Sequence, residues 1–486
     1  MTDCPVLGLA VTHPKLEAFS ARSNFDTIRL QSGSSSRVTS KRKQSIPNKA
    51  DRQLRQIMSN ESETICAWAA LLPPRQPSRP LSGPKDCAVA VVGAGLVGLA
   101  AARRLTELCP GDRIVVLDAG SVGEGAAGRN SGYTIDAPLP HSMTAKTTLG
   151  DAAATQLTLA RGAHAWLDRI VREKGIKCGW RRTGRFYAAA TDNGLRALDG
   201  LVRQLESYGE LTTRLSQGEL QEQLGTAYYL SAVFNPSCTL VQPMALIRGL
   251  ADTLPDGVEL FENSRVVDWT SRNGRHELHT ADGIVIARRV IWATHTDIGD
   301  FSRLGGRYMT LFTYAGVTPE LSDEELGSGA LDEWGVLPAL RAGSTVRRIP
   351  GGRILIRSLS SYGRVLSGLE IRQGLQPLLA ARFPQAGVRP LQYVWGGSVS
   401  ITRHADPYLG EIRPGAYAFT GCNGSGIIKG SAYGRLLAEL ASDHRSEELE
   451  IALREPMAGW IPPEPLRRMA VSYTLSRSAR VAGCEV

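Results

Sequence analysis

The sequence is poor in the features that mark several classes of protein. Its eight cysteines are scattered over 486 residues with no C-x-x-C pair and no histidine at metal-ligand spacing, which excludes a disulfide scaffold and leaves no metal site to predict. It has no run of 18 uncharged apolar residues and no apolar signal core at its N-terminus, so it predicts neither a membrane span nor standard secretion. These absences favour a globular protein of a reducing compartment, the cytoplasm.

Acidic residues are the scarcer charge: 56 Lys and Arg stand against 47 Asp and Glu, a net charge of +9. Such an excess can indicate a nucleic-acid or membrane-surface partner. Residues 1–57, however, hold ten of the basic and four of the acidic residues together with a Ser-rich run, and we predict a disordered basic extension there. Whether it is a native arm or sequence upstream of a true start at Met58 stays open. The rest of the chain is nearly balanced, so a nucleic-acid partner is not expected.

Proline is concentrated in the next segment. Five prolines lie between residues 73 and 84, and proline suits neither the interior of a helix nor a central strand. We therefore predict a Pro-rich lead over 58–85 and expect the packed part of the chain to begin near Asp86.

From Cys87 the pattern changes to an unbroken apolar run, which is typical of a buried parallel strand. A glycine-rich turn follows, then a helical stretch over Leu99–Leu108 and a second buried strand that ends on Asp118. Together they predict one complete βαβ unit.

The turn of this unit reads Gly93-Ala94-Gly95-Leu96-Val97-Gly98, a G-x-G-x-x-G pattern. Gly93 permits the tight turn, Gly95 lets the backbone approach a pyrophosphate, and Gly98 lets the helix pack close to the sheet. The helix N-terminus offers free N–H groups to the phosphates, and Asp118 would accept hydrogen bonds from ribose hydroxyls. The unit therefore predicts a dinucleotide-binding site.

Three later glycine-rich segments, in this order and at these distances, carry a family resemblance. They are Gly125-Ala126-Ala127-Gly128-Arg129-Asn130-Ser131-Gly132, then Trp395 to Thr402 with Asp406 to Gly410, and finally Gly421-Cys422-Asn423-Gly424-Ser425-Gly426. With the βαβ unit they span residues 86 to about 440, and together they resemble the FAD-dependent D-amino-acid oxidase and glycine oxidase superfamily. The sequence is most similar to its γ-glutamylputrescine oxidoreductase branch, which implies amine oxidation in amino-acid metabolism or polyamine catabolism.

The resemblance implies an α/β fold with a Rossmann-like FAD-binding domain and a mixed or antiparallel substrate domain. The FAD-binding domain is expected from residues 86–150, 236–300 and 391–445, and the substrate domain from 151–235 and 301–390. The last folded element is expected to be the helix through Leu440, and residues 446–486 are expected to form a C-terminal tail.

FAD is expected to bind without a covalent bond, because no Cys or His occupies a position where relatives attach it. The turn at Asn423 to Gly426 would stabilise charge on the reduced flavin through backbone N–H groups and the helix dipole, while Gly421, Gly424 and Gly426 would leave space for the ring. The resemblance adds four further cofactor-binding residues: Ala119, Val266, Gly397 and Ile427.

The implied reaction passes a hydride from a carbon bearing an amine to flavin N5, and the resulting imine is hydrolysed by water. Reoxidation would use oxygen or an electron carrier. Arg357 would pair a substrate carboxylate, and the aromatic side chains expected to wall the cavity are Tyr362, Trp395 and His404. His295 is expected to cap a turn and Lys429 to be a solvated helix lysine.

Two other functions remain open from the sequence. The first is a nicotinamide-dependent dehydrogenase that uses the same βαβ unit. The second is a non-catalytic binding protein that uses the basic N-terminal arm.

Overall fold

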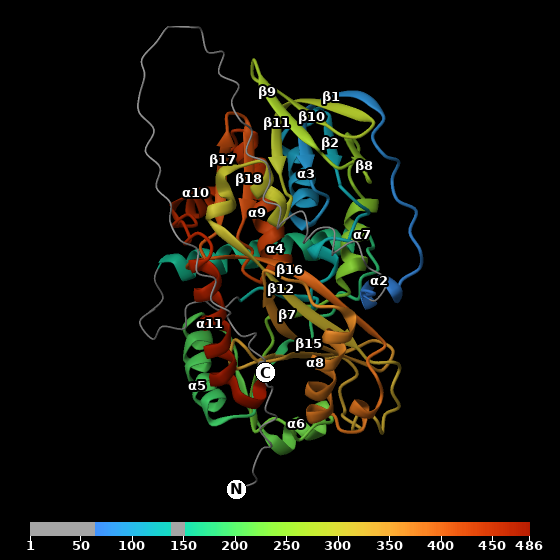
Figure 1. Ribbon diagram of the computed structural model, residues 1–486, viewed down its shortest axis with the longest axis vertical. Helices are drawn as coiled ribbons and strands as arrows, with labels where there is room; N and C mark the ends of the chain where they lie inside the picture. Colours follow the sequence, from blue (N-terminus) through green and yellow to red (C-terminus); the bar gives the residue numbers. More distant parts are fainter. Residues whose placement is uncertain (1–63, 138–150) are drawn as a thin grey trace, which may run out of the picture. The chain divides into compact units, whose positions relative to one another are not determined.

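The computed structural model describes residues 64–137 and 151–486 (Figure 1). The disordered basic extension predicted for residues 1–57 lies outside these described residues. Among the helices in the two ranges, none combines the length and the hydropathy of a membrane span.

The first sheet has eight strands and contains the predicted βαβ unit. The strand order is β17-β18-β11-β1-β2-β8, and β10 and β9 extend it from β11. The central strands β18, β11, β1, β2 and β8 are parallel, whereas β17 and the β9–β10 pair are antiparallel to their neighbours. The strand bounds are β1 Gly83–Val92, β2 Ile114–Leu117, β8 Val258–Phe261, β9 Asp268–Arg272, β10 Arg275–His279, β11 Gly283–Trp292, β17 Tyr408–Arg413 and β18 Ala416–Thr420.

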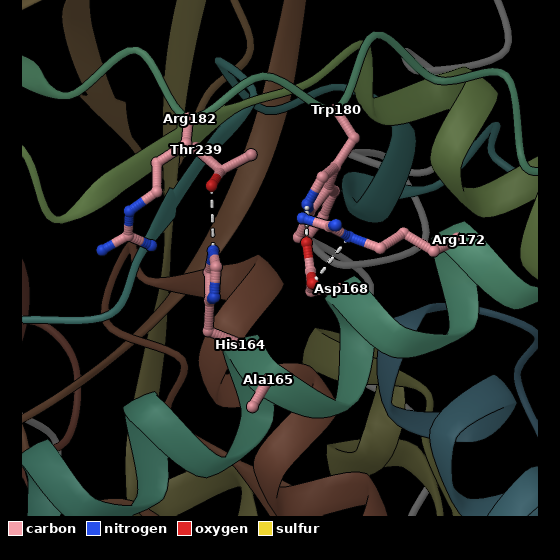
Figure 2. A pocket seen from close by; sticks show the side chains of 7 residues that line it. All are labelled: His164, Ala165, Asp168, Arg172, Trp180, Arg182 and Thr239. Carbon is pink, nitrogen blue, oxygen red and sulfur yellow. Dashed lines mark hydrogen bonds and ion pairs between the residues drawn. The ribbon is translucent and has the colours of Figure 1, made fainter.

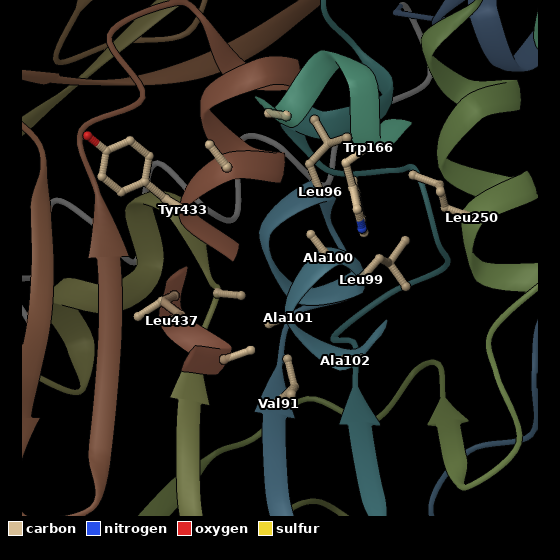
Figure 3. Packing of buried hydrophobic residues seen from close by; sticks show 14 of the residues in the cluster. Val91, Leu96, Leu99, Ala100, Ala101, Ala102, Trp166, Leu250, Tyr433 and Leu437 are labelled. Carbon is tan, nitrogen blue, oxygen red and sulfur yellow. The ribbon is translucent and has the colours of Figure 1, made fainter. Parts of the chain in front are cut away.

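Helices α3 (Leu96–Leu108) and α9 (Gly426–Ala441) pack against each other and against the strands of this sheet. Their backbones approach closely, because a Cβ on Gly434 would lie 2.3 Å from the carbonyl oxygen of Val97. Figure 3 shows Leu96, Leu99 and Ala100 of α3 filling the space beside Trp166, which comes from α4 (Asp151–Glu173). Although the sequence assigns α4 to the substrate domain, its apolar face is part of the core of the first sheet.

The second sheet also has eight strands, in the order β16-β12-β15-β14-β13-β4-β6-β5. Helix α8 (Gly368–Arg382) packs on one face of it, while α5 (Asp192–Ser207) and α6 (Gln217–Leu224) pack on its β4–β6–β5 side. The strand bounds are β4 Arg185–Ala189, β5 Thr213–Ser216, β6 Ser231–Asn235, β12 Tyr308–Val317, β13 Trp334–Pro338, β14 Thr345–Ile349, β15 Arg353–Tyr362 and β16 Tyr393–Thr402.

One strand differs from the predicted division into domains. The sequence places residues 391–445 in the FAD-binding domain, but β16 forms the edge of the second sheet and pairs with β12 along its whole length. The physical reason is that β16 carries a pairing register of ten residues with β12, which no local pattern in the sequence reveals. The segment 391–445 therefore crosses from one sheet to the other.

Two short strands and one helix link the sheets. β3 (Tyr133–Ile135) pairs with β7 (Cys238–Leu240) in an antiparallel two-stranded sheet. Helix α7 (Pro243–Asp252) follows β7, with its first turn capped by the Gln242 side chain, and it buries its apolar face in the same core as α3.

The prediction that residues 58–85 are an unstructured lead and that packing begins near Asp86 is wrong for the described part of this segment. Residues Ala67–Ala70 form helix α2, and Ala67 and Trp68 are 0% and 2% exposed. Pro84 lies inside β1 and pairs with Ile284. It is tolerated because this end of β1, residues 83–88, has β11 as its only partner among the described strands, whereas β2 joins β1 only from Val89. The prolines between α2 and β1 belong to a segment, residues 71–82, that runs over the surface.

The buried carboxylate of Glu262 anchors this segment through hydrogen bonds. Glu262, which is 0% exposed, accepts hydrogen bonds from the Arg75 guanidinium at 2.9 and 2.7 Å, from Ser78 N at 2.6 Å and from Val122 N at 2.6 Å. The sequence did not indicate this pair, because its members lie 187 residues apart.

Replacing Arg75 by alanine is expected to lower the free energy of unfolding by about 3 kcal/mol, because the Glu262 carboxylate would stay buried without its counter-charge. Denaturant titration measures the change. Arg214→Ala serves as the control: its pair with Asp199 is largely exposed, with side chains 43% and 55% accessible, and it should cost less than about 1 kcal/mol. Equal losses in the two variants would contradict this role of Arg75.

The prediction that folding ends with the helix through Leu440 is also wrong. Helices α10 (Glu447–Arg454) and α11 (Leu466–Ala482) follow it. The last residues are docked on the second sheet: the Glu485 side chain is 2% exposed and accepts hydrogen bonds from Ala190 N and Thr191 N.

Candidate active site

The turn between β1 and α3 has the geometry that its glycines predict. Gly93 has φ +107°, and a Cβ there would lie 2.6 Å from the carbonyl oxygen of Ala293 at the end of β11. A Cβ on Gly98 would lie 1.8 Å from the carbonyl oxygen of Gly93, so only glycine lets α3 sit on the turn. Gly95 is different: its Cβ would meet no heavy atom nearer than 3.7 Å. It begins α3 without a side-chain cap and with no acidic residue in the first turn, which leaves the helix N-terminus available to an anion.

Asp118 follows β2, as predicted, and its carboxylate is engaged by the backbone. It accepts hydrogen bonds from Ala94 N at 2.7 Å and Gly120 N at 3.0 Å, and burial raises its pKa. Since a carboxylate has about four acceptor positions, two remain for further donors beside the exposed Ala119.

The loop at Arg129 to Gly132 holds its shape partly through its own side chains. Asn130 donates from Nδ2 to the carbonyl oxygen of Ala127 and accepts from Gly132 N, and Arg129 donates from Nε to the carbonyl oxygen of Glu124. Gly397 of β16 faces this loop, because a Cβ on it would lie 3.6 Å from the Arg129 Cβ. The first and second sheets therefore meet here.

The turn at Gly421 to Gly426 is held by Asn423. This residue has φ 51°, is 3% exposed, donates from Nδ2 to the carbonyl oxygens of Gly421 and Ala405, and accepts from Thr402 N. No heavy atom lies within 4 Å of a Cβ built on Gly424 or Gly426, so open space faces both of them. Helix α9 begins at this turn without a side-chain cap.

The predicted reason for glycine at position 421 needs correction. A Cβ on Gly421 would strike the Thr402 Cγ2 at 2.8 Å, and its φ is +90°. Glycine is required there by packing inside the protein rather than by space for a flavin ring. Val266 and Ile427 are likewise buried, at 6% and 2% exposed, so they offer little surface to a ligand.

Arg357 lies in the middle of the second sheet. It pairs with Ala315 of β12 and Thr345 of β14, and Ala315 in turn pairs with Trp395. Paired residues point to the same face of a sheet, and Ala315 and Trp395 belong to the face that packs on α2. No described residue forms a hydrogen bond or an ion pair with the guanidinium, and burial alone lowers its pKa. Arg357 is thus a half-buried, partly desolvated cation without a counter-charge in the described part of the chain.

Tyr362 lies on the same face of the second sheet as Arg357, whereas His404 lies beyond the end of β16. Tyr362 pairs with Leu311 and Arg357 with Ala315, four residues further along β12, so both side chains project from one face. The Tyr362 hydroxyl donates to Glu464 at 2.5 Å, and the acidic partner helps to raise its pKa to about 12, after burial. His404 is exposed in the turn that follows β16. The cavity-wall role of both residues stays a prediction.

His295 does not cap a turn, contrary to prediction. Its Nε2 lies 3.4 Å from the Sγ of Cys422 in the glycine-rich turn, and its backbone has φ 53°. Burial acts to raise the pKa of Cys422, but His295 lowers it overall, to about 6; the pKa of His295 is raised in turn. The contact therefore favours the thiolate form of Cys422 and the imidazolium form of His295 beside the start of α9.

Alkylation of Cys422 by iodoacetamide is expected to rise with a midpoint near pH 6, because the thiolate is the reacting form. Peptide mass spectrometry at a series of pH values measures it. His295→Asn should move the midpoint upward. Cys178, which is 1% exposed and whose pKa burial raises to about 12, is the internal control and should stay unlabelled. A rate that rises only above pH 8 would contradict the pair.

Lys429 is not solvated, contrary to prediction. It lies in the first turns of α9, is 9% exposed, and burial lowers its pKa. Asp406 and Glu455 are its acidic neighbours, and each of them has a raised pKa that burial explains first. Ionisable side chains of both signs are therefore clustered around the N-terminal part of α9.

A separate cavity of about 320 Å³ lies against α4 (Figure 2) and is lined by His164, Ala165, Asp168, Arg172, Trp180, Arg182 and Thr239. Its polar side chains bind one another or a neighbour: His164 contacts Thr239 at 2.9 Å, Trp180 and Arg172 contact Asp168, and Arg182 contacts Asp136. None of the predicted site residues lines it. With its polar groups paired, it offers no recognition group to a ligand.

Comparison with known proteins supports the arrangement. A family model described as "DAO: FAD dependent oxidoreductase" matches residues 88–440. The gamma-glutamylputrescine oxidoreductase of Escherichia coli is 28% identical over 360 residues, covering 73% of this chain and 83% of that protein. A Haemophilus influenzae protein named "Probable oxidoreductase OrdL" is 27% identical over 379 residues, covering 75% and 86%.

Among solved structures, glycine oxidase from Geobacillus kaustophilus matches with a TM-score of 0.62 and 22% identity, covering 74% of this chain and 96% of that chain. At this identity the likeness concerns the fold, and it confirms the predicted α/β fold class.

Proposed function

The chain belongs to the family of FAD-dependent oxidoreductases described by the DAO model, and from this premise we propose that it oxidises the CH–NH bond of an amine or amino acid that carries a carboxylate, using non-covalently bound FAD. The gamma-glutamylputrescine oxidoreductase of Escherichia coli supports the choice of substrate class, since gamma-glutamylputrescine is an amine with a carboxylate.

The residues of the first sheet fit FAD. The open N-terminus of α3 at Gly95 suits a diphosphate, and Asp118 keeps acceptor positions for ribose hydroxyls. The space facing Gly424 and Gly426 and the uncapped start of α9 suit a planar ring that gains negative charge on reduction. We propose these groups, together with the loop at Arg129 to Gly132, as the cofactor site.

Arg357 is the observation that carries the substrate class. A desolvated guanidinium without a counter-charge is costly, and it is stabilised when an anion fills its fork of donors. A substrate carboxylate bound by Arg357 would orient the amine end of the same molecule.

When bound, FAD supplies a two-electron acceptor for the hydride that leaves the carbon next to nitrogen. The nitrogen loses one proton, the product is an imine, and water converts the imine into a carbonyl compound and ammonia or a smaller amine. The protein's own contribution would be orientation by Arg357 and exclusion of water. Oxygen or an electron carrier would accept the electrons afterwards.

Anaerobic mixing of the purified protein with matched pairs of amines tests the proposal. Each pair has the same chain with and without a carboxylate, for example 4-aminobutyrate and propylamine, and N-methylglycine and dimethylamine. We expect the visible flavin absorption band to bleach with carboxylate-bearing members only. A protein without a flavin band, or no bleaching by any member, would overturn the function; equal bleaching within pairs would overturn the role of the carboxylate.

A further inference from the structure

Four consecutive carbonyl groups of the loop at Arg129 to Gly132 are each bound by a side chain from elsewhere in the chain. Trp395 Nε1 donates to the carbonyl oxygen of Arg129 at 3.0 Å, and Trp68 Nε1 to that of Asn130 at 2.8 Å. Arg347 donates from one guanidinium nitrogen to the carbonyl oxygens of Ser131 and Gly132, at 3.1 and 3.2 Å. We call these three side chains the carbonyl clamp.

The clamp is a single buried cluster built from three separate segments. Trp68, Trp395 and Arg347 are 2%, 1% and 1% exposed and come from α2, β16 and β14. The two indole rings meet edge to face with centroids 6.4 Å apart, and the Arg347 guanidinium lies 5.5 Å from the centre of the Trp68 ring. Glu333 balances the arginine at 2.7 Å.

The carbonyl contacts also decide where the loop's N–H groups point. In a trans peptide the C=O and the following N–H point in opposite directions. Binding the carbonyls of Arg129 and Asn130 to the clamp therefore turns the N–H groups of Asn130 and Ser131 to the other side of the loop. Neither N–H has an acceptor among the described residues, whereas the next one, Gly132 N, is taken by the Asn130 side chain.

We propose that Trp68 is a positioning residue for the cofactor: through the carbonyl clamp it holds the N–H groups of Asn130 and Ser131 toward bound FAD. This inference rests on the proposed function. It gives a role to a segment that precedes the βαβ unit and lies outside the matched family model, which begins at residue 88.

The contacts of Trp68 favour a role in orientation over simple space filling. Its backbone is tied on the opposite side, because Gln242 Nε2 donates to the carbonyl oxygen of Trp68 at 2.6 Å. Trp68 is thus hydrogen-bonded through its backbone to Gln242 at the start of α7 and through its indole to the loop. A phenylalanine ring would keep part of the indole's volume but has no N–H, and so would leave the Asn130 peptide free to rotate.

Trp68→Phe is the test, and Trp180→Phe is its matched control. Trp180 also donates one indole hydrogen bond of 2.8 Å, to Asp168, but has no contact with the loop. Amide hydrogen exchange in the FAD-free full-length protein reports the loop directly. We expect Trp68→Phe to speed exchange of the Gly132 amide, whose N–H is bound by the Asn130 side chain, and Trp180→Phe to leave it unchanged.

Titration of FAD into the same proteins, followed by the quenching of flavin fluorescence, reports the cofactor. The dissociation constant should rise about fivefold to tenfold in Trp68→Phe, as expected for one lost hydrogen bond, and by less than about twofold in Trp180→Phe. The visible flavin spectrum of Trp68→Phe should also shift in shape, since the donors next to the ring change.

The outcomes separate the two claims. Unchanged exchange in Trp68→Phe would overturn the clamp, and faster exchange with unchanged FAD affinity would overturn its role toward the cofactor. If the unmutated protein does not bind FAD, the proposed function and the role of Trp68 toward the cofactor are both wrong. If it binds FAD but oxidises no amine, only the proposed function fails, and the exchange and titration results for Trp68 still stand.

Discussion

Replacing Arg357 by methionine is expected to lower kcat/KM for a carboxylate-bearing amine by roughly 10²–10⁴-fold, mainly through KM. Charge-assisted hydrogen bonds contribute about 1.5–3 kcal/mol each, and a guanidinium can form two of them with one carboxylate. The matched amine without a carboxylate should lose little, because it never used them. Steady-state kinetics with the two members of a pair measures the contrast.

The same variant should not be less stable than the unmutated protein. Arg357 has no hydrogen bond or ion pair within the described residues, and burial lowers its pKa, so removing the charge removes a desolvation cost. We expect an unchanged or higher Tm. Activity lost together with stability would instead indicate a structural arginine.

Two further variants sharpen this test. Arg357→Lys keeps the charge but not the paired donors, and its kcat/KM should fall between those of the unmutated protein and Arg357→Met. Arg364→Met removes an exposed arginine paired with Glu370, and it should leave kcat/KM within about twofold.

The second large effect concerns two glycines of one turn that the sequence pattern treats alike. Gly98→Ala is expected to lower the free energy of unfolding of the FAD-free protein by about 3 kcal/mol, because its Cβ would lie 1.8 Å from the carbonyl oxygen of Gly93 and α3 would have to move. Gly95→Ala should leave that stability nearly unchanged, since the nearest atom is 3.7 Å away.

In FAD binding we expect the opposite order, with a specific loss of affinity in Gly95→Ala rather than in Gly98→Ala. A Cβ on Gly95 stands at the open N-terminus of α3, where the diphosphate would approach, so Gly95→Ala should weaken FAD binding by roughly 10–100-fold without unfolding the protein. Denaturant titration of the FAD-free protein and FAD titration together separate the two roles.

Gly200→Ala, in α5, controls for the loss of a glycine as such, because no heavy atom lies closer than 4.0 Å to its Cβ position. It should be neutral or stabilise by about 0.5–1 kcal/mol. Wild-type FAD affinity in Gly95→Ala would contradict the assignment of this helix start to the cofactor.

Local pattern was enough to predict the βαβ unit. Its strands are buried on both faces and therefore read as unbroken apolar runs, and the turn between them needs glycine for reasons that are local to the turn. The start of α9 was predictable for the same reason, since a glycine-rich turn followed by apolar helical spacing is contained within a few residues.

Contacts between distant segments were not predictable. The pair of Arg75 with Glu262 and the contact of His295 with Cys422 join residues 187 and 127 positions apart. The proline content of the lead did not indicate that Trp68 is buried, because burial depends on the partner surface. Strand register puts Tyr362 on the same face of the second sheet as Arg357, whereas His404 lies in the turn beyond β16, a difference that chain order alone does not show.

The sequence alone determined the fold class, the family and the glycine-rich segments that we propose for the cofactor site, because each of these depends on residue types at short, regular spacing. The tertiary structure alone decided which sheet β16 joins, that Arg357 has no counter-charge among the described residues, and that Trp68, Arg347 and Trp395 meet on one loop. Those properties depend on long-range pairing and desolvation, which exist only after the chain has folded.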